Sequence, residues 1–247
     1  MAETTAAPAA LAAPAAWITG GTGALGAAVA RSFVTAGYRV AVTYRGVEEW
    51  NSLAGSERVA VASGYLLGIE TDVTDEASVR QAATAANQAF GRLDVLVHVA
   101  GGYAGGSPVE NVEARTVRSM IDTNLVSAFW AAKHAIPHAK RHGRGRLLFI
   151  SSRGAVEPAA GSAAYAAAKL GLHALVQALA KELKREGVTA NAVLPSVIDT
   201  AANRASMPDG KFDDWVKPEA IAQLLLFLAS EAAAATSGAL VPIYGRA

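Results

Sequence analysis

Cysteine is absent from the 247 residues of this chain. That absence excludes disulfides, thiolate zinc sites and cysteine nucleophiles, and it agrees with a reducing compartment. An excess of one charge is also absent, because 22 basic and 21 acidic residues give a formal net charge of +1. The chain therefore lacks the electrostatic footprint of a protein that binds nucleic acid or an anionic membrane. His134, His138 and His142 recur without carboxylate or thiol partners, so we predict no metal site.

Long hydrophobic runs are missing too. The most apolar window, residues 220–235, is too short and too interrupted to cross a bilayer. The alanine-rich start of the chain superficially resembles a signal peptide, but it has no basic segment, carries Glu3, and is interrupted by Pro8 and Pro14. We expect residues 1–14 to form a flexible tail and the protein to be cytoplasmic.

Apolar runs alternate with longer helical patterns along the rest of the chain. Strands buried on both faces and alternating with helices predict an α/β fold with a doubly wound parallel sheet of the Rossmann type, helices covering both faces. About seven strands fit one domain over 15–247, and no linker, repeat or change of composition divides it. We expect strands at 15–20, 38–44, 93–101, 145–152, 188–195 and 239–244, and a further strand within 64–73. We expect helices at 24–37, 75–91, 109–142 (with a bend at Pro137), 162–186 and 217–230, and a loop with a short helix at 46–63.

The stretch TGGTGALG, residues 19–26, follows the first predicted strand and opens a helix. Gly20, Gly23 and Gly26 are spaced so that the backbone turns tightly and approaches a pyrophosphate, which then lies on the positive end of the helix. Because the strand–turn–helix context accompanies the glycines, we predict a dinucleotide site here. A tight turn that binds nothing is the alternative.

The end of the second predicted strand bears on the choice of cofactor. NAD sites usually place an acid there for the ribose 2′-hydroxyl, whereas an arginine suits the 2′-phosphate of NADP. Here Tyr44 occupies the expected position of the acid and Arg45 follows, with no acid before Glu48. The pattern favours NADP(H) over NAD(H), unless Arg45 is only a solvated charge.

Three polar residues stand out in the alanine-rich stretch at 151–169. Tyr165 and Lys169 are four residues apart, so they share one face of a helix, and Ser152 precedes the tyrosine by thirteen residues. A free tyrosine has a pKa of about 10, and a lysine ammonium one turn away favours the phenolate. The pattern suggests a device for moving a proton rather than an ordinary surface pair.

With these residues in register, the chain after residue 15 resembles the short-chain dehydrogenase/reductase family. The catalytic set of that family matches Asn124, Ser152, Tyr165 and Lys169. Departures occur at Ala24 and Ser196, where the family has glycine, and at His98 and Val99, where it has two asparagines. The resemblance and the glycine pattern together predict the following cofactor-binding residues: Gly20, Thr22, Gly23, Ala24, Leu25, Gly26, Tyr44, Arg45, Asp72, Val73, Ala100, Gly101, Tyr165, Lys169, Pro195, Ile198 and Thr200.

The resemblance also implies roles for these residues. Tyr165 exchanges a proton with the substrate oxygen, which Ser152 also binds. Lys169 holds the nicotinamide ribose, and Asn124 helps hold a water that links Lys169 to solvent. The predicted activity is hydride transfer between NAD(P)(H) and a carbonyl or alcohol substrate. Relatives assemble as tetramers or dimers, so we expect a homo-oligomer, with a homotetramer as the first choice.

A narrower resemblance leaves an alternative open. The stretches GGTGALG, VAGGYAGG and NRASMP are similar to dihydropteridine reductase, a branch of the same family. That branch lacks the active serine and carries an acid after its second strand, and Ser152 and Arg45 depart from both features. Ketone reduction is therefore the leading interpretation and pteridine reduction the second, with a catalytically silent dinucleotide-binding protein as the competing class. Candidate substrate contacts are Gly102, Tyr103 and Ser196.

Overall fold

Seven parallel strands pair in the order β3-β2-β1-β4-β5-β6-β7. The computed structural model describes residues 13–246, so the predicted tail lies outside the described residues apart from its last two positions. The strands are β1 (Ala15–Thr19), β2 (Arg39–Tyr44), β3 (Leu66–Glu70), β4 (Val95–His98), β5 (Arg146–Ile150), β6 (Thr189–Pro195) and β7 (Leu240–Ile243). The predicted Rossmann-type single domain is confirmed.

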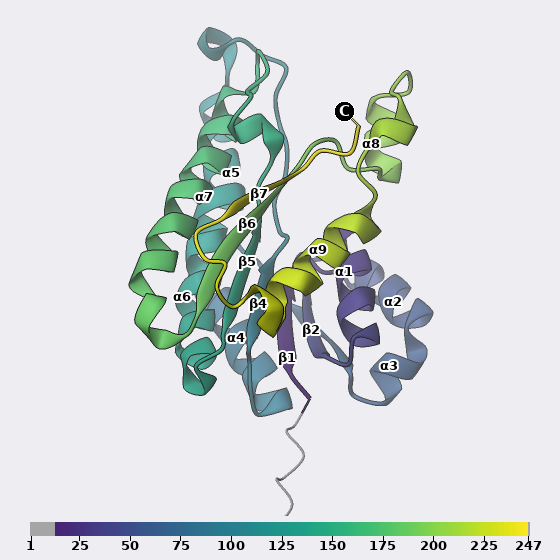
Figure 1. Cartoon of the computed structure of the whole chain (residues 1–247). Helices are drawn as coiled ribbons and strands as arrows, with labels where there is room; N and C mark the ends of the chain where they lie inside the picture. The colour runs from purple at the N-terminus through teal and green to yellow at the C-terminus, as the bar shows by residue number, and fades with distance from the viewer. Residues whose placement is uncertain (1–12, 247) are drawn as a thin grey trace, which may run out of the picture.

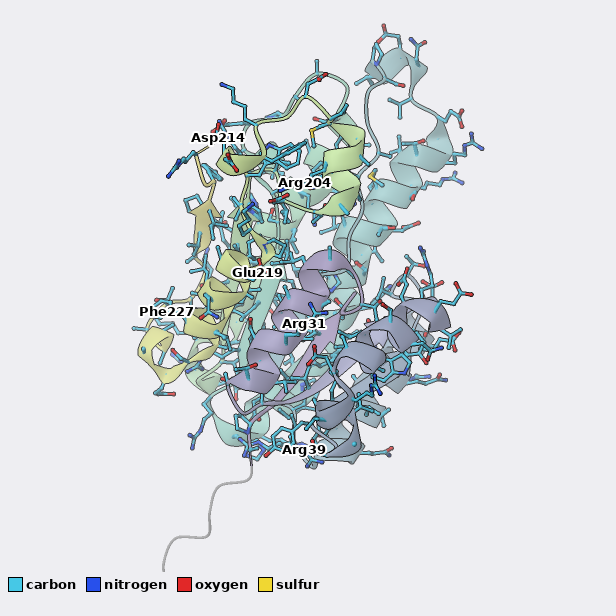
Figure 2. All side chains as sticks on the ribbon, turned by 90° about the vertical axis from the view of Figure 1, so that its right-hand side faces the viewer. Arg31, Arg39, Arg204, Asp214, Glu219 and Phe227 are labelled. Carbon is cyan, nitrogen blue, oxygen red and sulfur yellow. The ribbon has the colours of Figure 1, made fainter. Side chains whose placement is uncertain are left out.

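Helices cover both faces of this sheet (Figure 1). On one face lie α4 (Glu76–Phe90), α6 (Ser127–Ala139) and α7 (Ala163–Glu182), with α5 (Ala114–Ile121) beside α7. On the other face lie α1 (Ala24–Thr35) and α9 (Pro218–Ala229), with α2 (Val47–Ser56) and α3 (Arg58–Ala62) near β2 and β3. Figure 2 shows α1 and α9 together, carrying Arg31 and Phe227 toward the viewer.

Alternation along each strand divides the apolar side chains between two cores. In β1, Ala15 and Trp17 enter the core under α4, α6 and α7, whereas Ala16 and Ile18 enter the core under α1 and α9. Successive side chains of a strand point to opposite faces, so a strand buried on both faces needs apolar residues at every position. This explains why the strands are continuous apolar runs in the sequence.

The strand order reverses between β1 and β4, where the chain leaves β1 for β2 in one direction and β4 continues in the other. Open α/β sheets bind ligands outside the carboxyl ends of the strands at such a switch point. The glycine turn after β1 and the segment after β4 both end there, so the topology places the predicted cofactor residues at this edge.

Three segments differ from the sequence prediction. The region at 46–63 forms two helices, α2 and α3, because Leu53 and the partly buried Trp50 pack on the core. The helix predicted at 109–142 begins only at Ala114, continues through Pro137 to Ala139, and contains a π-helical turn at Asp122–Val126. The segment after β6 contains a short helix, α8 (Ala201–Ser206), that the prediction missed.

No helix within residues 13–246 is both long enough and apolar enough to cross a membrane.

The close packing of the glycine turn generates a stability prediction. A Cβ added at Gly26 would lie 2.1 Å from the carbonyl oxygen of Gly20, whereas one at Gly23 would lie 3.6 Å from its nearest neighbour. Overpacking costs about 1–3 kcal/mol, so Gly26→Ala should lower the melting temperature by roughly 2–12 °C.

Gly23→Ala is the matched control, because Gly23 has a φ of −67° that alanine adopts freely. Scanning calorimetry should leave its melting temperature close to the wild-type value. Equal melting temperatures for the two variants would contradict the packing that we describe.

Candidate active site

The glycine turn after β1 is held by backbone contacts that only glycine permits. Gly20 has a φ of +64° and its amide donates to the Thr43 hydroxyl at 3.0 Å. Gly26 meets the Gly20 carbonyl so closely that no side chain fits between them. Helix α1 begins at Ala24 with Gly23 as its N-cap, which has no side chain to cap the free N–H groups of the first turn. Such a helix start is a ready site for an anion.

A cavity of about 730 Å³ runs from this turn along the carboxyl edge of the sheet. It joins residues that are far apart in sequence, including most of those predicted to bind the cofactor. The predicted residues that line it are Gly20, Thr22, Gly23, Ala24, Leu25, Gly26, Tyr44, Arg45, Asp72, Val73, Ala100, Gly101, Gly102, Tyr103 and Thr200.

Arg45 lies exposed at one end of the cavity, beside the carboxylate of Asp72. The Thr74 hydroxyl and amide donate to Asp72 at 2.7 and 2.9 Å, and these bonds, with a smaller effect of the Arg45 charge, lower the pKa of Asp72. Asp72 is therefore an anchored anion at neutral pH. Tyr44 stacks on Trp50 with the rings 5.8 Å apart, so its ring forms part of the wall.

Glu49 is a cavity residue that the sequence analysis missed. Its carboxylate accepts a hydrogen bond from the Thr22 hydroxyl at 2.9 Å and lines the same end of the cavity as Arg45. The sequence analysis did not predict the bounds of helix α2, and this helix is what brings Glu49 back over the glycine turn. This end of the cavity thus holds one cation, Arg45, with two carboxylates, Asp72 and Glu49.

His98 is the last residue of β4 and is buried, being 1% exposed. The Ser127 hydroxyl donates to the Thr123 carbonyl at 2.6 Å, so His98 Nε2, 3.2 Å from Ser127 Oγ, is the donor of that pair. His98 Nδ1 then accepts from the Thr19 hydroxyl at 2.9 Å. Burial, with the charge of Lys169, lowers the pKa of His98 to about 3, so the ring is neutral and structural.

Asn124 lies fully buried inside the π-helical turn. Its Oδ1 accepts from the Gly102 amide at 3.1 Å, and its Nδ2 donates to the carbonyls of Gly102 and Met120, each at 3.0 Å. A Cβ added at Gly101 would lie 2.9 Å from Asn124 Oδ1 and 3.2 Å from Lys169 Nζ. The bare Gly101 backbone is therefore what lets Asn124 and Lys169 lie just behind the cavity.

Lys169 is anchored to the end of β5. Its Nζ donates to the carbonyl of Ile150 at 2.8 Å, and the side chain is buried. Burial of the ammonium lowers the pKa of Lys169 to about 8. Ser152 follows two residues after Ile150, and its hydroxyl accepts from the Gly154 amide at 3.0 Å.

Tyr165 lies half-buried one turn before Lys169 on α7, and the ring of Tyr103 meets it edge-on at 5.1 Å. The sequence predicts that Lys169 lowers the pKa of Tyr165. In the structure burial raises the pKa of Tyr165, a hydrogen bond with Ser152 opposes that rise, and Tyr103 adds to it. The expected lowering by Lys169 is therefore not what the structure gives, because burial of Tyr165 is the largest effect on this pKa.

The segment after β6 closes the far end of the site. Thr200 caps α8 and lines the cavity, whereas Ile198 pairs with Val216 and the Ser196 hydroxyl donates to the Tyr244 carbonyl at 2.7 Å. Pro195 ends β6. Of the residues predicted in this segment, Thr200 lines the cavity. The segment that leads to it contains Pro195, Ser196 and Ile198, which do not line the cavity.

A cluster of charges that the sequence analysis missed holds α8 in place. Asp199 pairs with Arg204 at 2.6 Å and with Lys217, and these hydrogen bonds hold the pKa of the Asp199 carboxyl far below its usual range. Arg204 also lies over the ring of Phe212, 4.6 Å from its centre. Figure 2 shows Arg204 on α8, above α1.

Comparison with known proteins decides the family. The model of the short chain dehydrogenase family matches residues 14–210. The chain belongs to this family. It is an NAD(P)-dependent short-chain oxidoreductase, as its relatives are named reductases and dehydrogenases.

Two relatives and one solved structure illustrate the similarity. The chain is 33% identical to the 3-oxoacyl-[acyl-carrier-protein] reductase MabA of Mycobacterium bovis, over 92% of this chain and 90% of that one. It is 35% identical to the 2,5-dichloro-2,5-cyclohexadiene-1,4-diol dehydrogenase LinX of Sphingobium indicum, over 95% and 96%. An actinorhodin polyketide ketoreductase variant solved with NADPH superposes with a TM-score of 0.86 at 27% identity, over 94% and 96%.

Burial of Lys169 generates a prediction about pH. Between its folded pKa of about 8 and its usual pKa of 10.5, the unfolded chain binds a proton that the folded chain does not. Stability therefore rises with pH across this window. Relative to a Lys169→Met variant, the free energy of unfolding should gain up to about 3 kcal/mol between pH 7 and pH 10.

Urea unfolding of both proteins at each pH gives this difference directly, and groups common to the two chains cancel. A difference that stays flat, or that falls as the pH rises, would contradict the buried ammonium.

Proposed function

We propose that this oxidoreductase reduces a ketone, or oxidises the matching secondary alcohol, with NADP(H) in preference to NAD(H). The proposal depends above all on one observation: Asn124, Tyr165 and Lys169 gather with Ser152 at the carboxyl ends of β4 and β5, beside the cavity. Names of relatives that reduce 3-oxoacyl and polyketide carbonyls support the substrate class.

The residues around the cavity fit a nicotinamide dinucleotide. The glycine turn offers free amides at a helix start for the pyrophosphate, and Asp72 with Val73 suits the adenine side. Arg45 suits the 2′-phosphate, because a guanidinium presents several donors to phosphate oxygens. Ala100, Gly101, Pro195, Ile198 and Thr200 would hold the nicotinamide half, with Lys169 on its ribose. When bound, this cofactor supplies or accepts the hydride.

The protein's own task is to move the proton. As the carbonyl carbon gains the hydride, the hydroxyl of Tyr165 gives its proton to the carbonyl oxygen, while Ser152 donates a hydrogen bond to the same oxygen. The phenolate left on Tyr165 regains a proton from solvent through Lys169 and a water held near Asn124. Oxidation of the alcohol runs these transfers in reverse.

The substrate enters beside Tyr103, whose side chain is 65% exposed and whose ring abuts Tyr165. Tyr103, Gly102 and Ser196 are the substrate contacts we propose. The names of the relatives support chemistry between a carbonyl and an alcohol and lend nothing to the pteridine alternative, from which Ser152 and Arg45 already depart.

We further propose that the protein is a cytoplasmic homo-oligomer, either a tetramer or a dimer. Support comes from apolar side chains left exposed on neighbouring helices, namely Val117 and Ile121 on α5, Phe129 on α6 and Leu170 on α7. A second copy would cover this face.

Cofactor choice is testable at the charged end of the cavity. Arg45→Ala should weaken NADPH binding by about tenfold or more and leave NADH within about twofold, because only NADPH has the extra phosphate. Glu49→Gln should strengthen NADPH binding severalfold, because it removes a carboxylate from the same end. Fluorescence titration of both cofactors measures both effects, and equal losses for NADPH and NADH in Arg45→Ala would overturn the assignment.

Substrate class is testable at Ser152. Ser152→Ala should lower kcat for ketones by roughly 10²-fold, comparable to losing one oxyanion donor. A quinonoid pterin takes the hydride on a conjugated ring and should depend on Ser152 much less. The measurement is NADPH oxidation with a panel of ketones. We expect the wild type to oxidise NADPH with members of this panel and Ser152→Ala to lose this activity.

Two results would count against the ketone assignment. Strong pterin turnover that survives Ser152→Ala, with no ketone turnover, would favour the pteridine alternative. Tight cofactor binding with no turnover on either class would favour a silent protein.

A further inference from the structure

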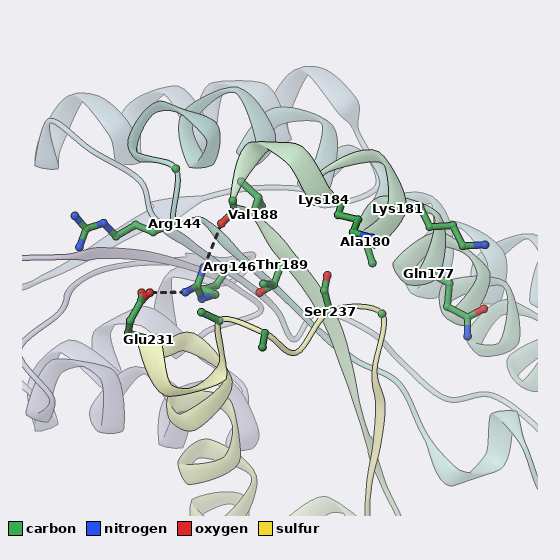
Figure 3. A pocket seen from close by; sticks show the side chains of 15 residues that line it. Arg144, Arg146, Gln177, Ala180, Lys181, Lys184, Val188, Thr189, Glu231 and Ser237 are labelled. Carbon is green, nitrogen blue, oxygen red and sulfur yellow. Dashed lines mark hydrogen bonds and ion pairs between the residues drawn. The ribbon is translucent and has the colours of Figure 1, made fainter.

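A second cavity, of about 820 Å³, lies at the opposite edge of the sheet from the active site. It opens where β5 and β6 begin, between the last turn of α7 and the loop that leads from α9 to β7 (Figure 3). None of the residues proposed above for catalysis or cofactor binding lines it.

Positive charge dominates the lining. Arg146 begins β5 and Arg144 precedes it, whereas Lys181 lies in the last turn of α7 and Lys184 follows that helix; the lining has a single carboxylate, Glu231. Within residues 13–246, Arg144, Lys181 and Lys184 have no ion pair, whereas Lys140 nearby is paired with Glu186. These four cations line one hollow, and their combined positive potential favours a bound anion.

Arg146 is the unusual member, because its guanidinium is buried and incompletely paired. Its side chain is 3% exposed, and Nη1 donates to the carbonyls of Gly145 and Gly187 at 3.0 and 3.5 Å. The Nε is buried with no hydrogen-bond partner, and so is the hydroxyl oxygen of Thr189 beside it (Figure 3). Leaving a buried donor unpaired is costly, and a ligand oxygen removes that cost.

Glu231 makes only one of the hydrogen bonds that the guanidinium of Arg146 offers. Its carboxylate reaches Nη2 of Arg146 at 3.3 Å, yet its own side chain is 79% exposed. Carboxylates and phosphates normally take Nε and Nη2 of an arginine together, through two parallel hydrogen bonds. Glu231 takes only one of the two, from the solvent side.

We propose that this cavity binds a small polyanion of the phosphate-ester or polyphosphate class. One phosphate group takes Nε and Nη2 of Arg146 and the Thr189 hydroxyl, and displaces Glu231. A second anionic group lies against Lys181 and Lys184. Phosphate fits better than carboxylate, since a tetrahedral oxyanion offers acceptors to all three inner donors at once, whereas a carboxylate has two oxygens in one plane.

Pyrophosphate is the probe, measured by isothermal titration calorimetry at low ionic strength. All variants are made in an Arg45→Ala background and titrated in the presence of saturating NADH, which occupies the glycine turn, so that pyrophosphate binding in the cofactor cavity is suppressed throughout. Lys181→Ala/Lys184→Ala should weaken pyrophosphate binding by at least about tenfold, the scale of one hydrogen bond to a charged group. Thr189→Val should weaken it severalfold, and Glu231→Gln should strengthen it severalfold because the competing carboxylate is gone.

Arg58→Ala/Arg80→Ala is the matched control, because it removes the same charge from exposed positions on α3 and α4. Its affinity should stay within about twofold of the background chain. Pyrophosphate should also bind about tenfold more tightly than inorganic phosphate, since it reaches both groups of cations. Equal affinities in the lysine variant and the arginine control, or weaker binding in Glu231→Gln, would overturn the proposal.

Discussion

The hydrogen bond from Lys169 to the carbonyl of Ile150 is the constraint on which the site depends. A buried ammonium needs acceptors, and the last carbonyl of β5 supplies one at the edge of the sheet. This contact fixes the start of α7 against β5, so Tyr165 and Ser152 are brought together by the same anchor. The charge is costly to bury, which is why its pKa falls to about 8 and why it lies beside the cavity rather than within a core.

A second hydrogen-bond network positions the half of the site that lies at the carboxyl ends of β1 and β4. Thr19 at the end of β1 donates to His98 at the end of β4, and its hydroxyl oxygen accepts from the Ala100 amide at 3.3 Å. The neutral His98 ring then donates to Ser127 on α6. The segment that follows β4 is therefore tied to both neighbouring elements, and Gly101 is presented to Lys169 and Asn124 with no side chain between them.

Much of this arrangement was predictable from local pattern. The apolar strands and the glycine turn depend on neighbouring residues, so their positions could be predicted within a few residues. Features set by distant contacts could not. The π-helical turn of Asn124 depends on Gly102, the helix α2 depends on the fit of Leu53 into a core, and the approach of Glu49 to Thr22 follows from that helix. The raised pKa of Tyr165 has the same origin, because burial is a tertiary property that a four-residue spacing does not reveal.

The central claim, that Tyr165 supplies the proton while the carbonyl carbon gains a hydride, is tested most directly by isotope transfer. NADPH labelled with deuterium at C4 of the nicotinamide is incubated with a ketone substrate and either the wild type or Tyr165→Phe. The account predicts deuterium on the carbinol carbon with the wild type. For Tyr165→Phe it predicts that NADPH still binds and that the transfer rate is lower by about 10²- to 10⁴-fold, the usual contribution of a general acid. Transfer by Tyr165→Phe at the wild-type rate would contradict it.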